Sequence, residues 1–415
     1  MVRFPYLVDG GRQSGSIRVA YPFSLASPER AVLPAVALGV ATYIGQLCLA
    51  ERIELEPGLP VGAAADLTAV ATMLYDVRRW MDELPLGPSP QYAFEKRKRE
   101  LSMPQLDERK AILLFSGGKD SSLAALVLQR NGLEAIALHM TANFGVEEAE
   151  QRAAEEISAA LGLPFEVVAV EHSEFLALSS RYAINWNDFP YSNRVPFGRD
   201  LLLAALSVIP AIRHRAGTIS FGHDNECRNA VVQYEGREIP RNDIESRWGA
   251  LSLESFIRKH VHPGIRMLPP VGGLSEFRIL EEMLVRHGDL MARTASCFWG
   301  GNCGRCAKCL RYYLAQRVLD TRALEFAVNP LGREGCPELS DLIDPQEARS
   351  TLFSGQVVYM LGTLLQRGDV RPDEEQLSAL GPNWLQQVAP RLPSLQRELR
   401  QVHVDPQVPQ GFRSP

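Results

Sequence analysis

The sequence predicts an α/β protein built on a parallel sheet with helices on both faces, a small N-terminal α+β domain and a helical C-terminal extension. Short apolar runs such as residues 111–115 are typical of strands buried on both faces. Helical segments alternate with these runs, which favours parallel strands. The 415 residues, 46% hydrophobic and 22% charged, suit a soluble protein of two or three domains.

The N-terminal α+β domain is expected over residues 1–105. Strands are predicted at residues 4–8, 16–20 and 52–56, with a turn at 9–11. Residues 31–50 carry no charge over a length that can span a membrane. The Ser27–Pro28 start signal, the glycines and the lack of a second such stretch favour a buried core helix. A second helix is expected over residues 64–84, and a linker at residues 87–90 and 95–100.

The central domain is expected over residues 106–315. Strands are predicted at residues 111–115, 135–139, 165–170 and 218–222. One helix is predicted to end at Gly132, and two others are predicted over residues 146–161 and 199–213. The C-terminal extension, residues 316–415, is expected to be helical, notably at 356–365 and 376–380.

A glycine-rich loop lies between the first of these central strands and its helix. It consists of Ser116, Gly117, Gly118, Lys119, Asp120, Ser121 and Ser122. An α/β sheet binds ligands at the carboxyl ends of its strands, and a helix N-terminus attracts anions. Lys119 can neutralise phosphate oxygens and Asp120 can hold Mg²⁺. The spacing differs from a Walker A loop, so we predict a phosphate site of another kind.

Four of the seven cysteines lie close together in the sequence, and they are Cys297, Cys303, Cys306 and Cys309. Four thiolates at this spacing favour a closed tetrahedral zinc site, while an iron–sulfur cluster is the alternative. The odd cysteine count and this cluster indicate a reducing, cytoplasmic compartment. The start of the chain lacks the pattern of a signal peptide. A net charge of −5 argues against a broad nucleic-acid-binding surface.

The glycine-rich loop resembles the SGGxDS loop of the PP-loop ATP-pyrophosphatases, whose fold is of the adenine nucleotide alpha hydrolase type. Together with the later SC…CGxCxxC pattern, it resembles the 7-cyano-7-deazaguanine synthase family. Residues 195–200 resemble that family's VPxRN segment, and residues 219–224, ISFGHD, resemble its substrate loop. The resemblance covers residues 110–315.

The resemblance implies that ATP adenylates the carboxylate of 7-carboxy-7-deazaguanine and that an amine then forms an amide. It implies ATP, Mg²⁺ and Zn²⁺ as cofactors, with zinc on the four cysteines. It assigns catalysis to Lys119, Asp120 and Arg199. It assigns ATP binding to Ser116–Ser122, with His139 and Met140 framing the adenine. The candidates for binding the substrate are Arg199, Asp200, Gly222, His223, Asp224 and Asp243.

The sequence also departs from the family. Asp200 stands in place of an asparagine, residues 142–150 differ from a YGQxH-type run, and about 100 residues are added at each end. These additions suit either an oligomer surface or a partner protein. Branches resembling this family occur in anti-phage operons, where a partner's amine would replace ammonia as the acceptor. The alternatives are nitrile synthesis for queuosine, a tRNA-modifying enzyme and a non-catalytic scaffold.

Overall fold

A computed structural model of the chain describes residues 1–8, 13–47, 49–59, 62–96, 103–141, 147–171, 199–295, 297, 301–337, 339–343, 353–370, 377, 380 and 383–412. The predicted turn at 9–11, Cys48, residues 142–146, residues 195–198 and most of the predicted helix at 376–380 lie outside these ranges.

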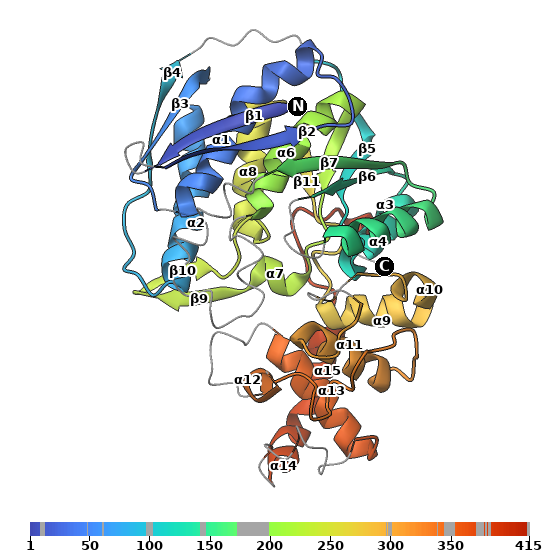
Figure 1. The fold of residues 1–415 in the computed structure, drawn as a ribbon. Helices are drawn as coiled ribbons and strands as arrows, with labels where there is room; N and C mark the ends of the chain where they lie inside the picture. Colours follow the sequence, from blue (N-terminus) through green and yellow to red (C-terminus); the bar gives the residue numbers. More distant parts are fainter. Residues whose placement is uncertain are drawn as a thin grey trace.

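The centre of the molecule is a seven-stranded sheet (Figure 1). Its strands, in order across the sheet, are β1 (Val2–Val8), β2 (Gln13–Ala20), β7 (Phe165–Glu171), β6 (Glu134–Met140), β5 (Asp107–Leu114), β8 (Ala216–Ser220) and β11 (Arg266–Leu268). From β7 to β11 all neighbours are parallel, while β1 and β2 form a hairpin that joins β7 antiparallel. The sheet is therefore mixed and mostly parallel, and the predicted α/β class is confirmed.

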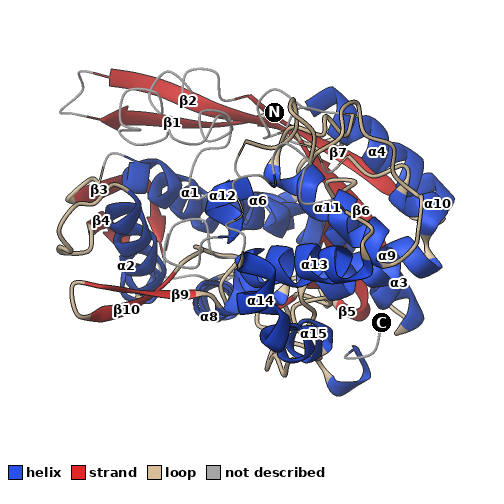
Figure 2. Cartoon of the chain, turned by 90° about the horizontal axis from the view of Figure 1, so that it is seen from below, coloured by secondary structure: helices blue, strands red, loops and turns tan. Residues whose placement is uncertain are grey.

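Helices cover both faces of the sheet, as predicted (Figures 1 and 2). Side chains of β5 alternate between the two cores: Ile112 belongs to one and Leu113 to the other. The Ile112 core is covered by α1 (Ser27–Leu47), α2 (Ala63–Met81), α6 (Arg199–His214) and α8 (Arg247–His260). The Leu113 core is covered by α3 (Lys119–Arg130), α4 (Glu147–Ala160), α9 (Glu276–Arg286), α11 (Ala307–Val318) and α13 (Ser354–Arg367).

Helix α1 is a core helix, which confirms the interpretation of its uncharged run. Val32, Leu38 and Tyr43 are fully buried. A Cβ atom at Gly39 would lie 2.7 Å from the Cβ of Ala205, so glycine lets α1 cross closely over α6. No described helix is long and apolar enough to cross a membrane.

The N-terminal segment differs from the expected unit in two ways. The linker predicted at residues 95–100 is wrong at residues 95–96. These residues end β4 (Gln91–Lys96), which pairs in parallel with β3 (Arg52–Leu59). The hairpin of β1 and β2 lies in the main sheet, because β2 pairs with β7. Residues 1–105 thus share a sheet with the central unit, and the division of the chain at residues 105 and 315 stays a prediction.

Further short elements complete the chain. They are α7 (Asn225–Asn229), β9 (Val231–Tyr234), β10 (Arg237–Pro240), α10 (Gly288–Met291), α12 (Leu339–Ile343), α14 (Trp384–Val388), η6 (Ala389–Arg391), α15 (Leu392–Arg400) and η7 (Gln410–Phe412). The hairpin β9–β10 and helix α7 were not predicted.

The C-terminal residues pack against the loops at the carboxyl ends of the strands. The side chain of Arg228, in α7, forms a fully buried ion pair with Asp405. The backbone N–H of His403 donates to the carbonyl of Gly273 over 2.7 Å. A buried ion pair restrains both of its segments, because separating them would leave an uncompensated charge. The C-terminal tail therefore fixes α7 and the loop before α9, which flank the candidate site.

Candidate functional site

The glycine-rich loop makes a tight turn between β5 and α3. Gly117 has a φ of +71°, and a Cβ atom there would lie 2.5 Å from the backbone nitrogen of Ala154 in α4. Only glycine fits both constraints. The hydroxyl of Ser122 donates to the carbonyl of Gly118 over 2.8 Å, and the N–H of Gly118 donates to Ser116 Oγ over 3.3 Å. The first N–H groups of α3 have no partner within the helix, as an anion site requires.

The loop after β8 lies directly against the start of α3. A Cβ atom at Gly222 would be 2.6 Å from the backbone nitrogen of Ser121 and 2.7 Å from the carbonyl carbon of Asp120. Any larger residue would separate the two loops. Gly222 therefore brings His223 and Asp224 beside the glycine-rich loop, as expected of candidate substrate residues. We call this loop, residues 116–122, the phosphate loop after its predicted ligand.

Lys119 is buried, with a side chain only 2% exposed. Its Nζ lies 2.7 Å from both carboxylate oxygens of Asp120 and 3.2 Å from Oε1 of Glu276. Asp120 is 31% exposed, so its carboxylate also faces the open side of the loop. Lys119 thus connects the loop to α9, and its predicted contact with phosphate stays a prediction.

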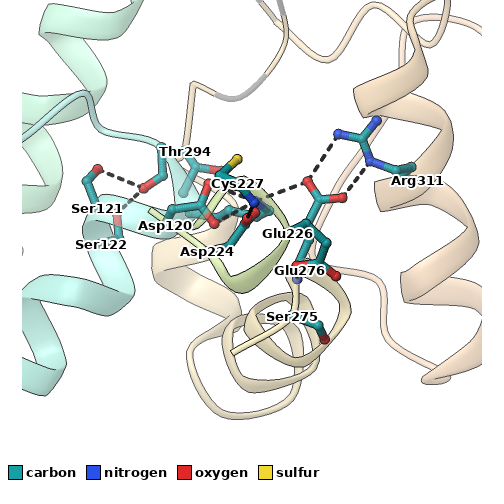
Figure 3. A network of polar contacts seen from close by, with 12 residues as sticks. Asp120, Ser121, Ser122, Asp224, Glu226, Cys227, Ser275, Glu276, Thr294 and Arg311 are labelled. Carbon is teal, nitrogen blue, oxygen red and sulfur yellow. Dashed lines mark hydrogen bonds and ion pairs between the residues drawn. The ribbon is translucent and has the colours of Figure 1, made fainter. Parts of the chain in front are cut away.

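Glu276 links this lysine to the C-terminal helices. Figure 3 shows its carboxylate facing the guanidinium of Arg311. Arg311, in α11, donates to its two carboxylate oxygens over 2.5 and 3.1 Å, and Gln356, in α13, donates over 3.1 Å. Burial alone would raise the pKa of Glu276, but Arg311 and Lys119 hold it at about 2. Glu276 is therefore a permanent anion at neutral pH, held between two buried cations.

Two further acidic residues lie beside the loop. Asp224 caps α7 by accepting the N–H of Cys227 over 2.8 Å, and Glu226 accepts the N–H of Glu276 over 3.0 Å. Burial and the neighbouring Asp120 raise the pKa of Asp224 to about 6. Burial and Asp224 raise the pKa of Glu226 well above its usual range. This side of the site therefore holds an excess of carboxyl groups that a bound cation would stabilise.

The other candidate substrate residues form a second group. Oxygens of Asp200 and Glu245 and a ring nitrogen of His223 all lie within 4.8 Å of one another. Arg199 Nε lies 3.8 Å from Asp200 Oδ1. Burial and Asp200 raise the pKa of Asp243 to about 7, whereas burial lowers that of His223 to about 4. The residues predicted from the substrate-like segments thus do converge, although their assignment to substrate stays a prediction.

His139 and Met140 end β6 and are buried. The ring of His139 is packed: its Nδ1 is 3.1 Å from the carbonyl of Phe115, and it stacks on Phe165 with ring centroids 6.3 Å apart. The side chains of His139 and Met140 are therefore occupied in packing. The predicted contact of these residues with adenine would be made by their backbone at the end of the strand.

The four predicted cysteines meet in one place, in the segment after α10 and in the first turn of α11. Their sulfur atoms all lie within 4.8 Å of one another, with Cys303 Sγ and Cys309 Sγ 3.9 Å apart. A tetrahedron with Zn–S bonds of about 2.3 Å has edges of about 3.8 Å. Backbone N–H groups point at the sulfurs of Cys297, Cys303 and Cys306, as expected for thiolates. The arrangement is consistent with a structural zinc site.

The cysteine cluster is joined to the phosphate loop. The N–H of Ala295, two residues before Cys297, donates to the carbonyl of Gly117 over 3.1 Å. Gly304 has a φ of +74°, and a Cβ atom there would lie 2.1 Å from the carbonyl oxygen of Val328, so the turn between the cysteines requires glycine. A metal that fixes this turn would also fix one edge of the loop.

Sequence analysis missed Glu276, Arg311, Gln356 and Glu245. Glu276 follows Ser275 at the start of a helix, where an acidic residue usually caps the helix in solvent. Gln356 lies in an amphipathic helix and would be placed on its polar face, whereas Arg311 lies in a helix that mixes polar and apolar residues on all sides. Lys119 was the signal that could have revealed Glu276. A lysine between a buried strand and a buried helix needs an anion beside it, so a carboxylate partner could have been sought.

Comparison with known proteins places parts of the chain among its relatives. Residues 109–192 match a family of unknown function (DUF7411), and residues 260–333 match another (DUF6395). A predicted subunit of a tRNA methyltransferase from Methanocaldococcus jannaschii has 20% identity over 41% of this chain and 71% of that chain, with a TM-score of 0.28. A similarity this low implies nothing about function.

Curated proteins give a more specific similarity. The chain is 27% identical to the 7-cyano-7-deazaguanine synthase of Sulfolobus acidocaldarius over 52% of this chain and 47% of that protein. It is 28% identical to that of Methanoculleus marisnigri over 48% of this chain and 90% of that protein. The chain is thus a distant homologue of these synthases, and it spans about half the length of the first of them.

The charge of Glu276 should be essential to stability. We expect Glu276→Gln to lower the free energy of unfolding by about 3 kcal/mol at pH 7, because Arg311 would stay buried without its anion and Lys119 would keep only Asp120. Since the pKa of Glu276 is depressed from 4.5 to about 2, its contribution is full above pH 4.5 and is lost as the pH falls toward 2. The difference in melting temperature between the wild type and Glu276→Gln should therefore narrow as the pH falls from 4.5 to 3.

The matched control is Glu334→Gln, which breaks the exposed ion pair of Arg305 with Glu334. It should cost less than about 1 kcal/mol. Equal melting temperatures for the Glu276→Gln and Glu334→Gln proteins would contradict the central role of Glu276.

The cysteine cluster should bind one zinc ion per chain. Elemental analysis of the purified protein should find zinc, and Cys309→Ser should lose it and lower the melting temperature, because a structural zinc site contributes folding energy. Cys227→Ser, which changes a cysteine outside the cluster, should keep the metal. Iron with inorganic sulfide in place of zinc would show that the cluster is of the iron–sulfur type.

Proposed function

We propose that this protein is an ATP-dependent enzyme that adenylates the carboxylate of 7-carboxy-7-deazaguanine and then forms an amide. The observation that best supports this is the phosphate loop, where the start of α3, Asp120 and the Gly222 loop meet within van der Waals distance. The distant homology with 7-cyano-7-deazaguanine synthases supports the choice of substrate.

The reaction would proceed in two displacements. A carboxylate oxygen of the substrate attacks the α-phosphorus of ATP, an O–P bond forms, and the bond to pyrophosphate breaks. An amine then attacks the acyl carbon, AMP leaves with the former carboxylate oxygen, and the amine loses a proton. Adenylation is needed because a free carboxylate has no good leaving group.

The residues of the loop would work mainly by position and charge. The N–H groups at the start of α3 would bind phosphate oxygens, and Ser116 and Ser121 would add hydroxyl donors. Asp120 would hold Mg²⁺, which neutralises phosphate charge when bound. Lys119 would hold the carboxylate of Asp120 in place through their 2.7 Å contacts. Arg199 would pair with a phosphate or carboxylate group.

For the acceptor, we propose an amine of a partner protein, as expected for a branch in anti-phage defence. The parts of the chain beyond the homologous half support this choice, since ammonia needs no docking surface. Inside that half, the hairpin β9–β10 and α8 also carry exposed apolar side chains, those of Val231 and Trp248, 39% and 38% exposed. Conventional nitrile synthesis is the alternative, with ammonia as the acceptor. The net charge of −5 disfavours tRNA as a substrate.

Pyrophosphate release from ATP should require the deazaguanine acid. Asp120→Ala should lower this rate by about 100-fold or more while the melting temperature stays near that of the wild type, since Asp120 is partly exposed. Glu134→Ala is the control, because Glu134 is exposed at the opposite end of β6 and should leave the rate unchanged. Turnover with tRNA and without the deazaguanine acid would refute the proposed substrate.

The acceptor can be identified by mass. Proteins encoded beside this chain should be co-expressed with it and measured intact. A partner that gains the mass of a deazaguanine acyl group with wild-type enzyme, and not with Asp120→Ala, would support conjugation. Formation of 7-cyano-7-deazaguanine from ammonia with no modified partner would support nitrile synthesis instead.

A further inference from the structure

Three potential metal ligands meet beside the phosphate loop, and each comes from a different segment. Asp200 is the second residue of α6, His223 follows β8, and Glu245 lies between β10 and α8. Their ligand atoms, one nitrogen and two carboxylate oxygens, lie within 4.8 Å of one another. Within the described part of the chain, this group and the four cysteines are the two that have such geometry.

The ring of His223 is fixed in place, and one of its nitrogen atoms can bind a ligand. Its ring stacks on Phe221, with centroids 4.9 Å apart and planes 22° apart, which fixes the ring. Its Nδ1 is buried and has no hydrogen-bond partner among the described residues. A buried polar atom without a partner is costly, and a metal ion is one way to satisfy it.

The charges around Asp200, His223 and Glu245 also favour a bound cation. The carboxyl groups of Asp200, Asp243 and Glu245 lie here, and Arg199 supplies the neighbouring positive charge. When all three are ionised, two negative charges remain in excess, which is the charge of one divalent cation. Neighbouring Arg228 adds nothing to this balance, because it is already paired with Asp405.

We propose that Asp200, His223 and Glu245 form a second metal site, which takes a divalent transition ion such as Mn²⁺, Fe²⁺ or Zn²⁺. One imidazole and two carboxylates suit these ions better than Mg²⁺. Three protein ligands leave coordination positions open for water or for an oxygen of a bound molecule. The site is separate from the cysteine cluster and from the Mg²⁺ expected at Asp120, and it does not depend on the proposed substrate.

The competing explanation is that Asp200 and Glu245 share a proton, so that no ion is required. A binding experiment separates the two. The full chain is washed with chelator until one zinc ion remains on the cysteines, and it is then titrated with Mn²⁺ without nucleotide. Loss of the electron paramagnetic resonance signal of free Mn²⁺ measures binding.

We expect one Mn²⁺ per chain, bound at least about tenfold more weakly by His223→Ala and by Glu245→Gln. Glu134→Gln, an exposed change at the far end of β6, and Asp120→Asn should both retain binding. If Asp120→Asn alone abolishes binding, the ion belongs to the phosphate loop and the proposal is wrong. If the wild type binds no Mn²⁺, the shared proton is the correct explanation.

A second measurement needs no variant. Pulsed electron paramagnetic resonance of the wild-type Mn²⁺ complex should show coupling to a histidine nitrogen, because the site contains His223. Neither the cysteine cluster nor the Asp120 carboxylate provides one. A spectrum without nitrogen coupling would overturn the assignment even if the variants fail to fold.

Discussion

The buried carboxylate of Glu276 is the contact on which the rest of the site depends. It lies between Lys119 and Arg311, so it joins the phosphate loop to α11, which carries the last of the four cysteines. Gln356 extends the connection to α13. Burial would lower the pKa of Lys119, yet Asp120, Tyr312 and Glu276 raise it well above its usual value, so the lysine stays charged. Buried ion pairs add little net stability but are costly to break. Their effect here is to set one spatial relation between segments that lie far apart in the sequence.

The second constraint is the close approach of two loops at the carboxyl ends of neighbouring strands. Because β5 and β8 are parallel and adjacent, their following loops leave the sheet on the same edge. Gly222 removes the side chain that would keep them apart. As a result, the phosphate loop and the loop of His223 and Asp224 form one surface. A nucleotide on the first and a second ligand on the other would be neighbours, as a reaction between them requires.

The sequence was sufficient for features that are local in the chain. Strand, glycine turn and helix follow each other between residues 111 and 130, and the four cysteines are near neighbours in the chain, so pattern and spacing identified both. Features that join distant segments could not be read in this way. The pairing of β2 with β7 depends on packing between segments that are distant in the sequence, and the partners of Lys119 include a glutamate in a much later helix. Residues 95–96 begin a charged run that resembles a linker, but they end a strand that pairs with β3. Glu245 matters only because Asp200 and His223 are folded beside it.

The balance of charge decides which ligands such a site can accept. Asp120, Asp224, Glu226 and Glu276 surround the start of α3, against the cations of Lys119 and Arg311. A triphosphate would add further negative charge to this surplus, and the dipole of α3 offsets only about half a charge. If a nucleotide binds here as proposed, divalent cations, or protons on Asp224 and Glu226, would have to enter with it. The pKa of Asp224, raised to about 6, shows that one of these carboxyls is already close to taking up a proton. Since a bound cation would lower that pKa again, metal binding at this loop should be coupled to proton release between pH 5 and pH 7.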